Sequence, residues 1–398
     1  MPDCGGEMVV RFKVQPEDFV VEERARLPLS QKGSYALYQV RKRGLTTLQV
    51  QARMAAALGI PRSAVCFPAL KDRNSAALQY GSIKGTGPAA LEGQGYSAQF
   101  VGRSSRPLQP RDLEGNHFTL TLRDLESHEV GHIRTRLSQV ECFGLPNYFD
   151  RQRFGSYAPG QGFVGKQILE RDVEGALRAY LSQPFRGDPS EVRAFKSLAR
   201  EHWGEWERLF EAAPRPSNLR SVLTFLKDHP TDFKKALNLI TPRLLSLWLS
   251  AYQSFLWNRT AGRYLESRLE EFGVHCFSIA VVEALPLYRE LPDPLLEALS
   301  EVKAPLLHHR ATFDDPRIAA EVERILAEEG LSLWDFKARV LKKAYLTRGE
   351  RALLLFPQEM VWLSEEADDR FLGKHKVRLA FFLPPGSYAT LVLKALTL

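Results

Sequence analysis

A carboxylate between two bases follows an apolar run early in the chain. The segment Phe67-Pro-Ala-Leu-Lys-Asp-Arg73 ends in Lys71, Asp72 and Arg73. Positive neighbours favour the ionised form of a carboxyl group, and an ionised aspartate can act as a nucleophile or as a general base. If a strand continues through the segment, the two bases point to the face opposite Asp72. A surface charge cluster at a strand end has the same pattern, so the residues alone leave both interpretations open.

Aromatic, amide and arginine side chains alternate in a second segment, 146–155, which reads Pro-Asn-Tyr-Phe-Asp-Arg-Gln-Arg-Phe-Gly. Aromatic faces can stack on an unpaired base, amides can bond base edges, and arginines can hold phosphates. Phe149, Asn147 and Arg153 are of these three types. The segment therefore suits unpaired RNA, although a turn that carries core aromatic residues would have the same composition.

A third polar segment, 13–23, contains Lys13 and Glu23 and, taken alone, is typical of a half-exposed hairpin edge. No GxGxxG motif after a strand, P-loop, HExxH or GxSxG motif occurs in the sequence. His308 and His309 are adjacent, so on a helix or strand they diverge instead of converging on a metal. The sequence therefore indicates no cofactor and no metal.

Strands and helices that alternate in the first third must position these segments. We expect short strands at 12–14 and 19–21, separated by a turn at 15–18. Thr47 is a suitable cap for a helix that runs to about residue 58. Period-2 alternation predicts a strand with one buried face over 118–122.

Helical patterns dominate after Gly155, and the last fifty residues again contain both strand-like and helix-like segments, as in the first third. We expect a long helix over 243–271 and a second helix from Asp315 to Gly330, with Pro316 in its first turn. A strand over 377–383 and a closing helix over 388–396 complete the chain. This return predicts one α/β domain that is interrupted by a helix-rich insertion.

Composition and charge set broader limits. The 398 residues are 44% hydrophobic and 25% charged, which is typical of a globular protein with ample core. Four cysteines in 398 residues are too few for a disulfide scaffold, and the expected setting is a reducing cytoplasm. The absence of a CxxC pair indicates neither a zinc knuckle nor a thioredoxin-type redox site. No segment has the roughly 20 apolar residues that span a bilayer. Of the net charge of +7, the first 155 residues carry +6, with 21 basic and 15 acidic residues, which weakly favours a polyanionic partner.

Taken together, the segments resemble the TruD family of tRNA pseudouridine synthases. The resemblance covers nearly the whole chain, and six short motifs in the right order make it specific. They are Pro16-Glu-Asp-Phe-Val-Val-Glu-Glu23, Leu70-Lys-Asp-Arg73 with Gln79, Glu114-Gly-Asn-His-Phe118, Gly144-Leu-Pro-Asn-Tyr-Phe149, Gln152-Arg-Phe-Gly155 and Leu383-Pro-Pro-Gly-Ser-Tyr-Ala-Thr390.

The resemblance implies the isomerisation of a uridine in tRNA, at position 13 of the D-arm, to pseudouridine without a cofactor or metal. It implies that Asp72 is the catalytic aspartate, that Phe149 stacks on the base, and that Asn147 helps to position Asp72. The expected substrate-binding residues are Phe149, Asn147, Lys13, Glu23, Lys71 and Arg153. The expected partner is tRNA, with no membrane and no metal, and the protein is expected to be a cytoplasmic monomer.

The resemblance also implies the fold, an α/β (α+β) protein with a mixed β-sheet catalytic domain. Residues 1–155 and 346–398 are expected to form the two parts of this pseudouridine synthase domain, with a TRUD insertion domain over 156–345. The two domains are expected to form a V with an RNA-binding cleft.

Two other function classes remain to be weighed. The chain would suit a non-catalytic RNA-binding or RNA-folding protein, which would release no tritium from 5-tritiated uridine. It would also suit a hydrolase that uses Asp72 and Glu23 as a carboxylate pair, and the release of free uracil would mark that case.

Overall fold

The computed structural model describes residues 10–185, 187–215 and 217–398, and these divide into two compact units. The sheet unit contains residues 10–145 and 355–398, and the helical unit contains residues 146–354. The chain crosses from one unit to the other within the short strands β8 (Leu145–Pro146) and β15 (Leu354–Leu355). The predicted insertion, 156–345, lies inside the helical unit. The assignment of the units to catalytic and insertion domains stays a prediction.

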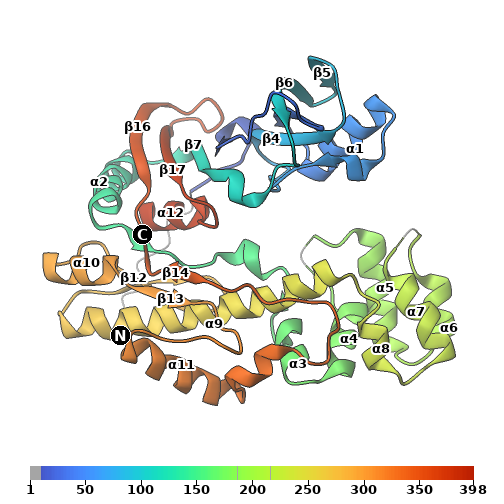
Figure 1. Ribbon diagram of the computed structural model, residues 1–398. Helices are drawn as coiled ribbons and strands as arrows, with labels where there is room; N and C mark the ends of the chain where they lie inside the picture. The colour runs from blue at the N-terminus through green and yellow to red at the C-terminus, as the bar shows by residue number, and fades with distance from the viewer. Residues whose placement is uncertain (1–9, 186, 216) are drawn as a thin grey trace. The chain divides into compact units, whose positions relative to one another are not determined.

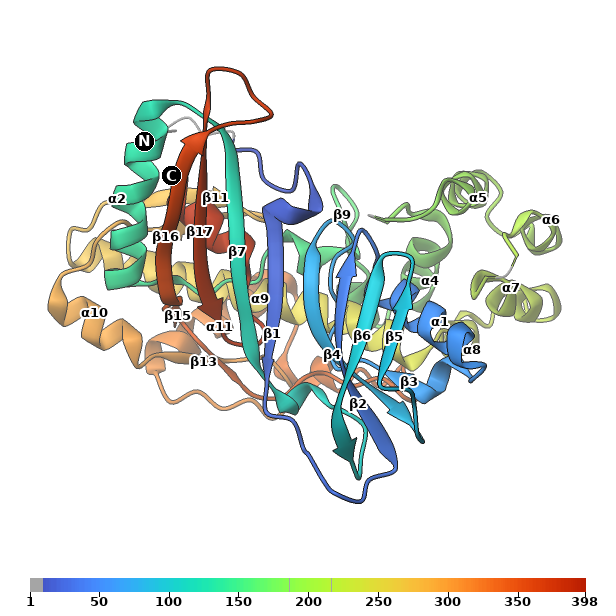
Figure 2. The same ribbon diagram turned by 90° about the horizontal axis from the view of Figure 1, so that it is seen from above.

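The sheet unit is built on a mixed sheet of nine strands (Figure 2). Its order is β16-β17-β7-β1-β4-β2-β6-β5, with β3 paired to β4. β1 and β4 run parallel, and the other neighbouring pairs run antiparallel. The strands are β1 Phe19–Ala25, β2 Tyr35–Arg43, β3 Val65–Cys66, β4 Ala76–Lys84, β5 Ala90–Gly93, β6 Tyr96–Ser104, β7 Leu113–Leu125, β16 Gln358–Ala367 and β17 His375–Leu383.

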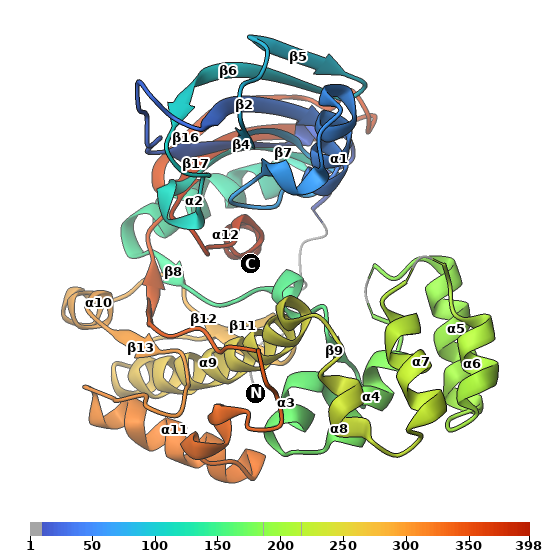
Figure 3. The ribbon, with the colours of Figure 1, turned by 45° about the vertical axis from the view of Figure 1, so that its right-hand side comes forward.

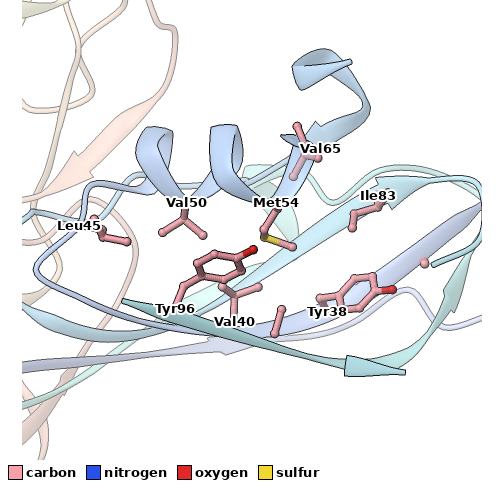
Figure 4. Close-up of a cluster of buried hydrophobic side chains, with 11 residues drawn as sticks. Tyr38, Val40, Leu45, Val50, Met54, Val65, Ile83 and Tyr96 are labelled. Carbon is pink, nitrogen blue, oxygen red and sulfur yellow. The ribbon is translucent and has the colours of Figure 1, made fainter. Parts of the chain in front are cut away.

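The first helix of the sheet unit, α1 (Thr47–Leu58), covers part of this sheet through a cluster of buried side chains (Figure 4). Val50 and Met54 are four residues apart and share one helix face. They pack against Tyr38 and Val40 of β2. The cap of α1 is Thr46, which accepts a hydrogen bond from the Gln49 amide, and not Thr47 as predicted. Thr47 begins the helix, so its hydroxyl is available for other contacts.

The other two helices of the sheet unit are α2 (Ser127–Phe143) and α12 (Ala389–Leu396), which pack against each other (Figure 3). The buried guanidinium of Arg136 on α2 donates to the carbonyl of Ala395 on α12 at 3.0 Å. A buried guanidinium must be paired, because an unpaired buried charge is strongly destabilising. This bond therefore fixes the closing helix, whose predicted span of 388–396 is confirmed to within one residue.

A second buried arginine joins the two sequence segments that build the sheet unit. Arg123 on β7 donates to Asp18 at 3.0 Å, to Asp368 at 2.8 Å and to Asp369 at 2.9 Å. Its side chain is only 4% exposed. The loss of one partner of a buried pair costs about 3–5 kcal/mol. The arginine thus ties the N-terminal segment and the β16–β17 hairpin to the middle of the sheet.

The helical unit is organised around the long helix α9 (Pro242–Glu271), with α11 (Pro316–Glu329) beside it (Figure 1). Both helices confirm the predicted spans, and α11 is capped by Asp315 and ends at Gly330 as expected. The remaining elements are β9 Tyr157–Ala158, β10 Gly162–Phe163, α3 Val164–Leu169, α4 Val173–Ser182, α5 Ser190–Glu201, α6 Trp206–Ala212, α7 Leu219–Asp228, α8 Phe233–Leu237, β11 Phe277–Ala280, β12 Ala284–Leu287, α10 Asp293–Ser300, β13 Lys303–Pro305 and β14 Glu350–Ala352.

One predicted strand is wrong, and a second strand, considered only as a condition, does not form. The segment 12–14 is not a strand, because Lys13 lies in the left-handed region with φ 63°. The apolar run that begins at Phe67 is not a strand either, and residues 67–75 form a loop between β3 and β4. Pro68 has no amide hydrogen for a sheet ladder, and Leu70 is 55% exposed. The mixed α/β fold class itself is confirmed. In the part of the chain that the structure describes, no helix is both long enough and apolar enough to span a membrane.

Candidate active site

Asp72 lies in the loop between β3 and β4, where its side chain is 39% exposed. Lys13 Nζ donates to Asp72 Oδ2 at 3.0 Å. The same ammonium lies 3.9 Å from the ring centroid of Phe19, on β1. A left-handed backbone costs a non-glycine residue about 1–3 kcal/mol. The ion pair and the aromatic contact offset the strain at Lys13, and they explain why this residue leaves the extended conformation.

The backbone carbonyl of Asp72 accepts hydrogen bonds from two buried side chains, those of Lys42 and Ser75. Lys42 Nζ, on β2, donates to the Asp72 carbonyl and also to Ser75 Oγ at 3.1 Å. Ser75 Oγ in turn donates to the Asp72 carbonyl at 2.9 Å. Both Lys42 and Ser75 are buried. Because these bonds fix the backbone at the aspartate, they limit the directions in which its partly exposed carboxylate can point.

Unlike the partly exposed side chain of Asp72, the side chain of Lys71 is buried, and it forms an ion pair. Its Nζ lies 2.8 Å from Glu23 Oε1 and donates to Asn116 Oδ1 at 2.6 Å. The other oxygen of Glu23 accepts the Tyr80 amide at 2.8 Å. The backbone amide of Lys71 donates to Thr47 Oγ1 at 2.8 Å. The ion pair thus links β1, β4, β7 and the loop before Asp72, and its contacts are those of groups that position the loop.

The structure therefore brings four of the sequence-predicted residues together on the sheet unit, as two ion pairs that meet at the adjacent positions 71 and 72. They are Lys13, Glu23, Lys71 and Asp72. Their functional roles stay predictions. Both oxygens of Glu23 are engaged and its side chain is fully buried. This bonding does not suit a second catalytic carboxylate, so it argues against the hydrolase alternative.

Lys42 is a site residue that the sequence analysis missed. It continues the buried face of β2 that begins at Ala36, and it lies between the exposed residues Arg41 and Arg43. Lys42 could have been noticed in the sequence, because it is a charged residue at a position that the alternating pattern of the strand assigns to the buried face. Burial lowers the pKa of Lys42 to about 8, against the opposing influence of the Asp72 carboxylate.

We expect the activity of the protein to fall as the pH rises through about 8, because Lys42 then loses its proton. A charged donor makes hydrogen bonds roughly twice as strong as a neutral one, so deprotonation loosens the loop that carries Asp72. The measurement is kcat/KM against pH. Lys42→Met should be slower and lack this alkaline limb, whereas Arg41→Ala, an exposed change on the same strand, should keep it. An unchanged limb in Lys42→Met would show that another group titrates.

The helical unit holds the other predicted residues. Asn147 Oδ1 accepts a hydrogen bond from Arg351 at 2.7 Å, and Asn147 Nδ2 donates to the Ala352 carbonyl at 3.2 Å. The same guanidinium lies 4.2 Å from the ring centroid of Phe149. Arg351 is on β14, about 200 residues from the motif, and no local pattern indicated it. It therefore holds both the amide and the aromatic side chain of the motif.

Phe149 is buried, and both its backbone and its ring make contacts with α9. Asn258, on α9, accepts the Phe149 amide and donates to the Phe149 carbonyl, each at 2.8 Å. The Trp257 ring meets the Phe149 ring edge to face, with centroids 5.7 Å apart. The Phe149 residue is 7% exposed. A stacking role for this ring requires that one of its faces becomes accessible when a substrate binds.

Arg153 lies in the 3-10 helix Arg151–Phe154, just after this motif. Its Nε donates to Ser254 Oγ at 3.0 Å, and its guanidinium lies 5.7 Å from the Phe149 ring centroid. Asn147, Phe149 and Arg153 are thus brought together on the helical unit. The residues around Asp72 belong to the sheet unit.

Among residues 10–185, 187–215 and 217–398, no group of three or more histidine, cysteine, aspartate or glutamate side chains is placed to hold a metal ion. The side chains that contact Asp72 in the described residues include those of Lys13, Lys42 and Ser75.

Comparison with known proteins identifies the family. The family model of tRNA pseudouridine synthase D (TruD) matches residues 2–276 and 295–396. The chain belongs to this family. The tRNA pseudouridine synthase D of Aquifex aeolicus is 27% identical over 98% of this chain and 98% of its own length. The protein of the same name from Syntrophotalea carbinolica is 29% identical over 99% of this chain and 96% of its own length.

A solved structure agrees with the fold. The crystal structure of a Methanosarcina mazei protein that carries the TruD name matches with a TM-score of 0.69, at 23% identity, over 98% of this chain and 94% of that one. Membership of the family confirms the predicted resemblance and makes the chain a pseudouridine synthase, which is an isomerase.

Proposed function

We propose that this enzyme converts the uridine at position 13 in the D-arm of tRNA into pseudouridine, with Asp72 as the catalytic residue. The proposal is supported by the exposure and the contacts of Asp72. Its carboxylate is partly exposed and paired with Lys13, while its backbone is fixed by Lys42 and Ser75. Such a group is reachable by a substrate and stays oriented. The family of the chain supports tRNA as the substrate.

The reaction begins with extrusion of the target nucleotide. A base inside folded RNA is not accessible to a side chain, and flipping it out costs a few kcal/mol. Stacking of an aromatic ring on the flipped base returns about 1–3 kcal/mol. Phe149 is the proposed stacking ring.

The chemical step rearranges two bonds to one carbon. The N1–C1′ bond breaks, the uracil rotates, and C5 bonds to C1′. The proton on C5 is then lost, and N1 gains one, so the product is an isomer. Asp72 acts either as the nucleophile at C1′ or as the base at C2′. Both routes develop positive character at C1′, which a nearby carboxylate stabilises, as in glycoside chemistry.

The lysines near Asp72 give the site a positive potential. Lys13 and Lys42 contact Asp72 itself, and Lys71 and Arg73 flank it in sequence. Positive groups attract the RNA backbone. The proposed arrangement needs one carboxylate only, because the base is retained and no water is activated.

Mapping of pseudouridine tests the proposed position. The enzyme should form pseudouridine in a tRNA transcript with uridine at position 13, detected by carbodiimide modification and primer extension. A transcript with cytidine at position 13 should gain none. Modification at a different uridine would retain the enzyme class and reject the position, whereas the release of free uracil would reject the isomerisation.

A further inference from the structure

The helical unit has a surface rich in unpaired positive charge. It comprises the segment 337–348, which is the orange-red trace between α11 and β14 in Figure 1, together with residues 308–310. We call it the cationic patch. Its side chains surround a cavity of about 360 Å³, lined in part by His308, His309, Lys337, Tyr345 and Arg348. Its six lysines and arginines are Arg310, Lys337, Arg339, Lys342, Lys343 and Arg348.

These cations have no acidic counterpart. Within the described ranges, no carboxylate lies within 4 Å of any of the six, although thirty other ion pairs occur. Asp335 lies two residues before Lys337, and its Oδ2 accepts the amide and hydroxyl of Ser332, at 2.9 and 2.7 Å. Desolvation lowers the pKa of Lys337, and the neighbouring cations Arg339 and Arg310 lower it further. The patch thus holds charges that repel one another.

The backbone of the patch is fixed in spite of this repulsion. Asn238 accepts the Lys342 amide and donates to the Val340 carbonyl, each at 2.8 Å. The Tyr345 amide donates to Ser246 Oγ at 3.0 Å, and Gln253 Nε2 donates to the Thr347 carbonyl at 2.8 Å. The segment contains no helix or strand between residues 338 and 349. Three polar side chains therefore hold an irregular loop in place, which preorganises its cations for a ligand.

Exposed aromatic side chains accompany the charges. Tyr345 is 77% exposed and lies at the rim of the cavity. Trp334 is 49% exposed, and Lys337 Nζ lies 3.4 Å from its ring centroid. Exposed aromatic faces next to unpaired cations are the two components that bind single-stranded nucleic acid. An acidic protein surface would use the cations but would not need the exposed rings.

We propose that the cationic patch is an RNA-binding surface of the helical unit, in addition to the residues around Asp72 on the sheet unit. The cavity takes a backbone phosphate, and Tyr345 stacks on an unpaired base beside it. This inference rests on the proposed function in that the RNA is the substrate tRNA. No local sequence pattern indicates this surface, because His308 and His309 lie about 30 residues from the segment 337–348 and only the fold brings them together around one cavity.

The test compares two triple variants. Lys337→Ala/Arg339→Ala/Arg348→Ala removes three patch cations. The matched control, Lys234→Ala/Lys235→Ala/Arg243→Ala, removes three exposed cations from elsewhere in the same unit. The dissociation constant of an unmodified tRNA transcript is measured against salt concentration. The patch variant should bind at least tenfold more weakly, and the slope of log Kd against log salt should fall by about 2. The control should stay close to the unaltered protein.

A second pair of variants tests stacking. Tyr345→Ala should weaken tRNA binding by roughly fivefold to a hundredfold, whereas Tyr345→Phe should retain the affinity. KM for tRNA should rise in the patch variants while kcat at saturating tRNA stays within about twofold. Equal losses in the patch and control triples would overturn the inference, and so would displacement of tRNA by poly-glutamate as effectively as by single-stranded RNA.

Binding and turnover separate this inference from the proposed function. If the unaltered protein binds tRNA through the patch but forms no pseudouridine, the proposed reaction fails and the RNA-binding surface stands. If pseudouridine forms normally and the patch variants bind tRNA as tightly as the control, the surface fails and the reaction stands.

Discussion

Asp72→Asn should abolish isomerisation while tRNA binding stays within about threefold. The amide is nearly isosteric with the carboxylate, but it can act neither as a nucleophile nor as a base. Removal of the group that performs the chemistry is expected to cost roughly 10⁴-fold or more in kcat. The measurement is tritium release from tRNA that carries 5-tritiated uridine, with the dissociation constant of the same tRNA measured in parallel.

The matched control for this change is Glu22→Gln. Glu22 is an exposed carboxylate on β1 of the same unit, and it makes no ion pair in the described part of the chain. This variant should release tritium at close to the unaltered rate. Full turnover by Asp72→Asn would exclude Asp72 as the catalytic residue. Loss of tRNA binding together with turnover would instead indicate that the change disturbs the loop that Lys42 and Ser75 hold.

Phe149→Ala should lower both the activity and the stability of the enzyme. Loss of the proposed stack costs about 1–3 kcal/mol in kcat/KM. Loss of a buried phenylalanine ring costs about 3–5 kcal/mol in the free energy of unfolding. The motif alone suggests a much larger effect on activity than on stability. The contacts of the ring with Trp257 and Arg351 change this expectation, because they are the contacts of a buried side chain.

Phe149→Leu separates the two effects. Leucine refills most of the volume but presents no aromatic face, so melting temperature should largely recover while kcat/KM stays low. Phe163→Leu is the control, since Phe163 is another buried aromatic residue of the helical unit, 4% exposed. It should be less stable yet fully active well below its melting temperature. Normal kcat/KM in Phe149→Leu would show that the ring does not stack on the substrate.

Local sequence patterns predicted the elements that are stabilised locally. The helix α11 shows this well, because Asp315, Pro316 and Gly330 define its ends and its apolar residues repeat with the helical period. The same reasoning placed β17, whose buried residues alternate. It failed for residues 12–14, where the backbone of Lys13 follows a long-range ion pair instead of its own propensity.

The candidate site could be predicted only where its residues lie in short motifs. Asp72 stands between two bases, and Phe149 stands in a segment of aromatic, amide and arginine residues. Lys42 reaches Asp72 from another strand, and Arg351 reaches Asn147 across about 200 residues. These contacts depend on the order of strands in the sheet and on the position of β14. The local periodicity of the sequence carries no information on either.

The arginine that joins the ends of the sheet unit has a consequence for synthesis of the protein on the ribosome. Arg123 and its partner Asp368 are 245 residues apart. The whole helical unit lies between them in the chain, so it emerges and can fold first. Until residues 368–383 are translated, β7 lacks its partner β17, and of the three counter-ions of Arg123 only Asp18 has been made. Nascent chains therefore carry an open sheet edge for most of translation, and that edge is a site where chaperones would be needed.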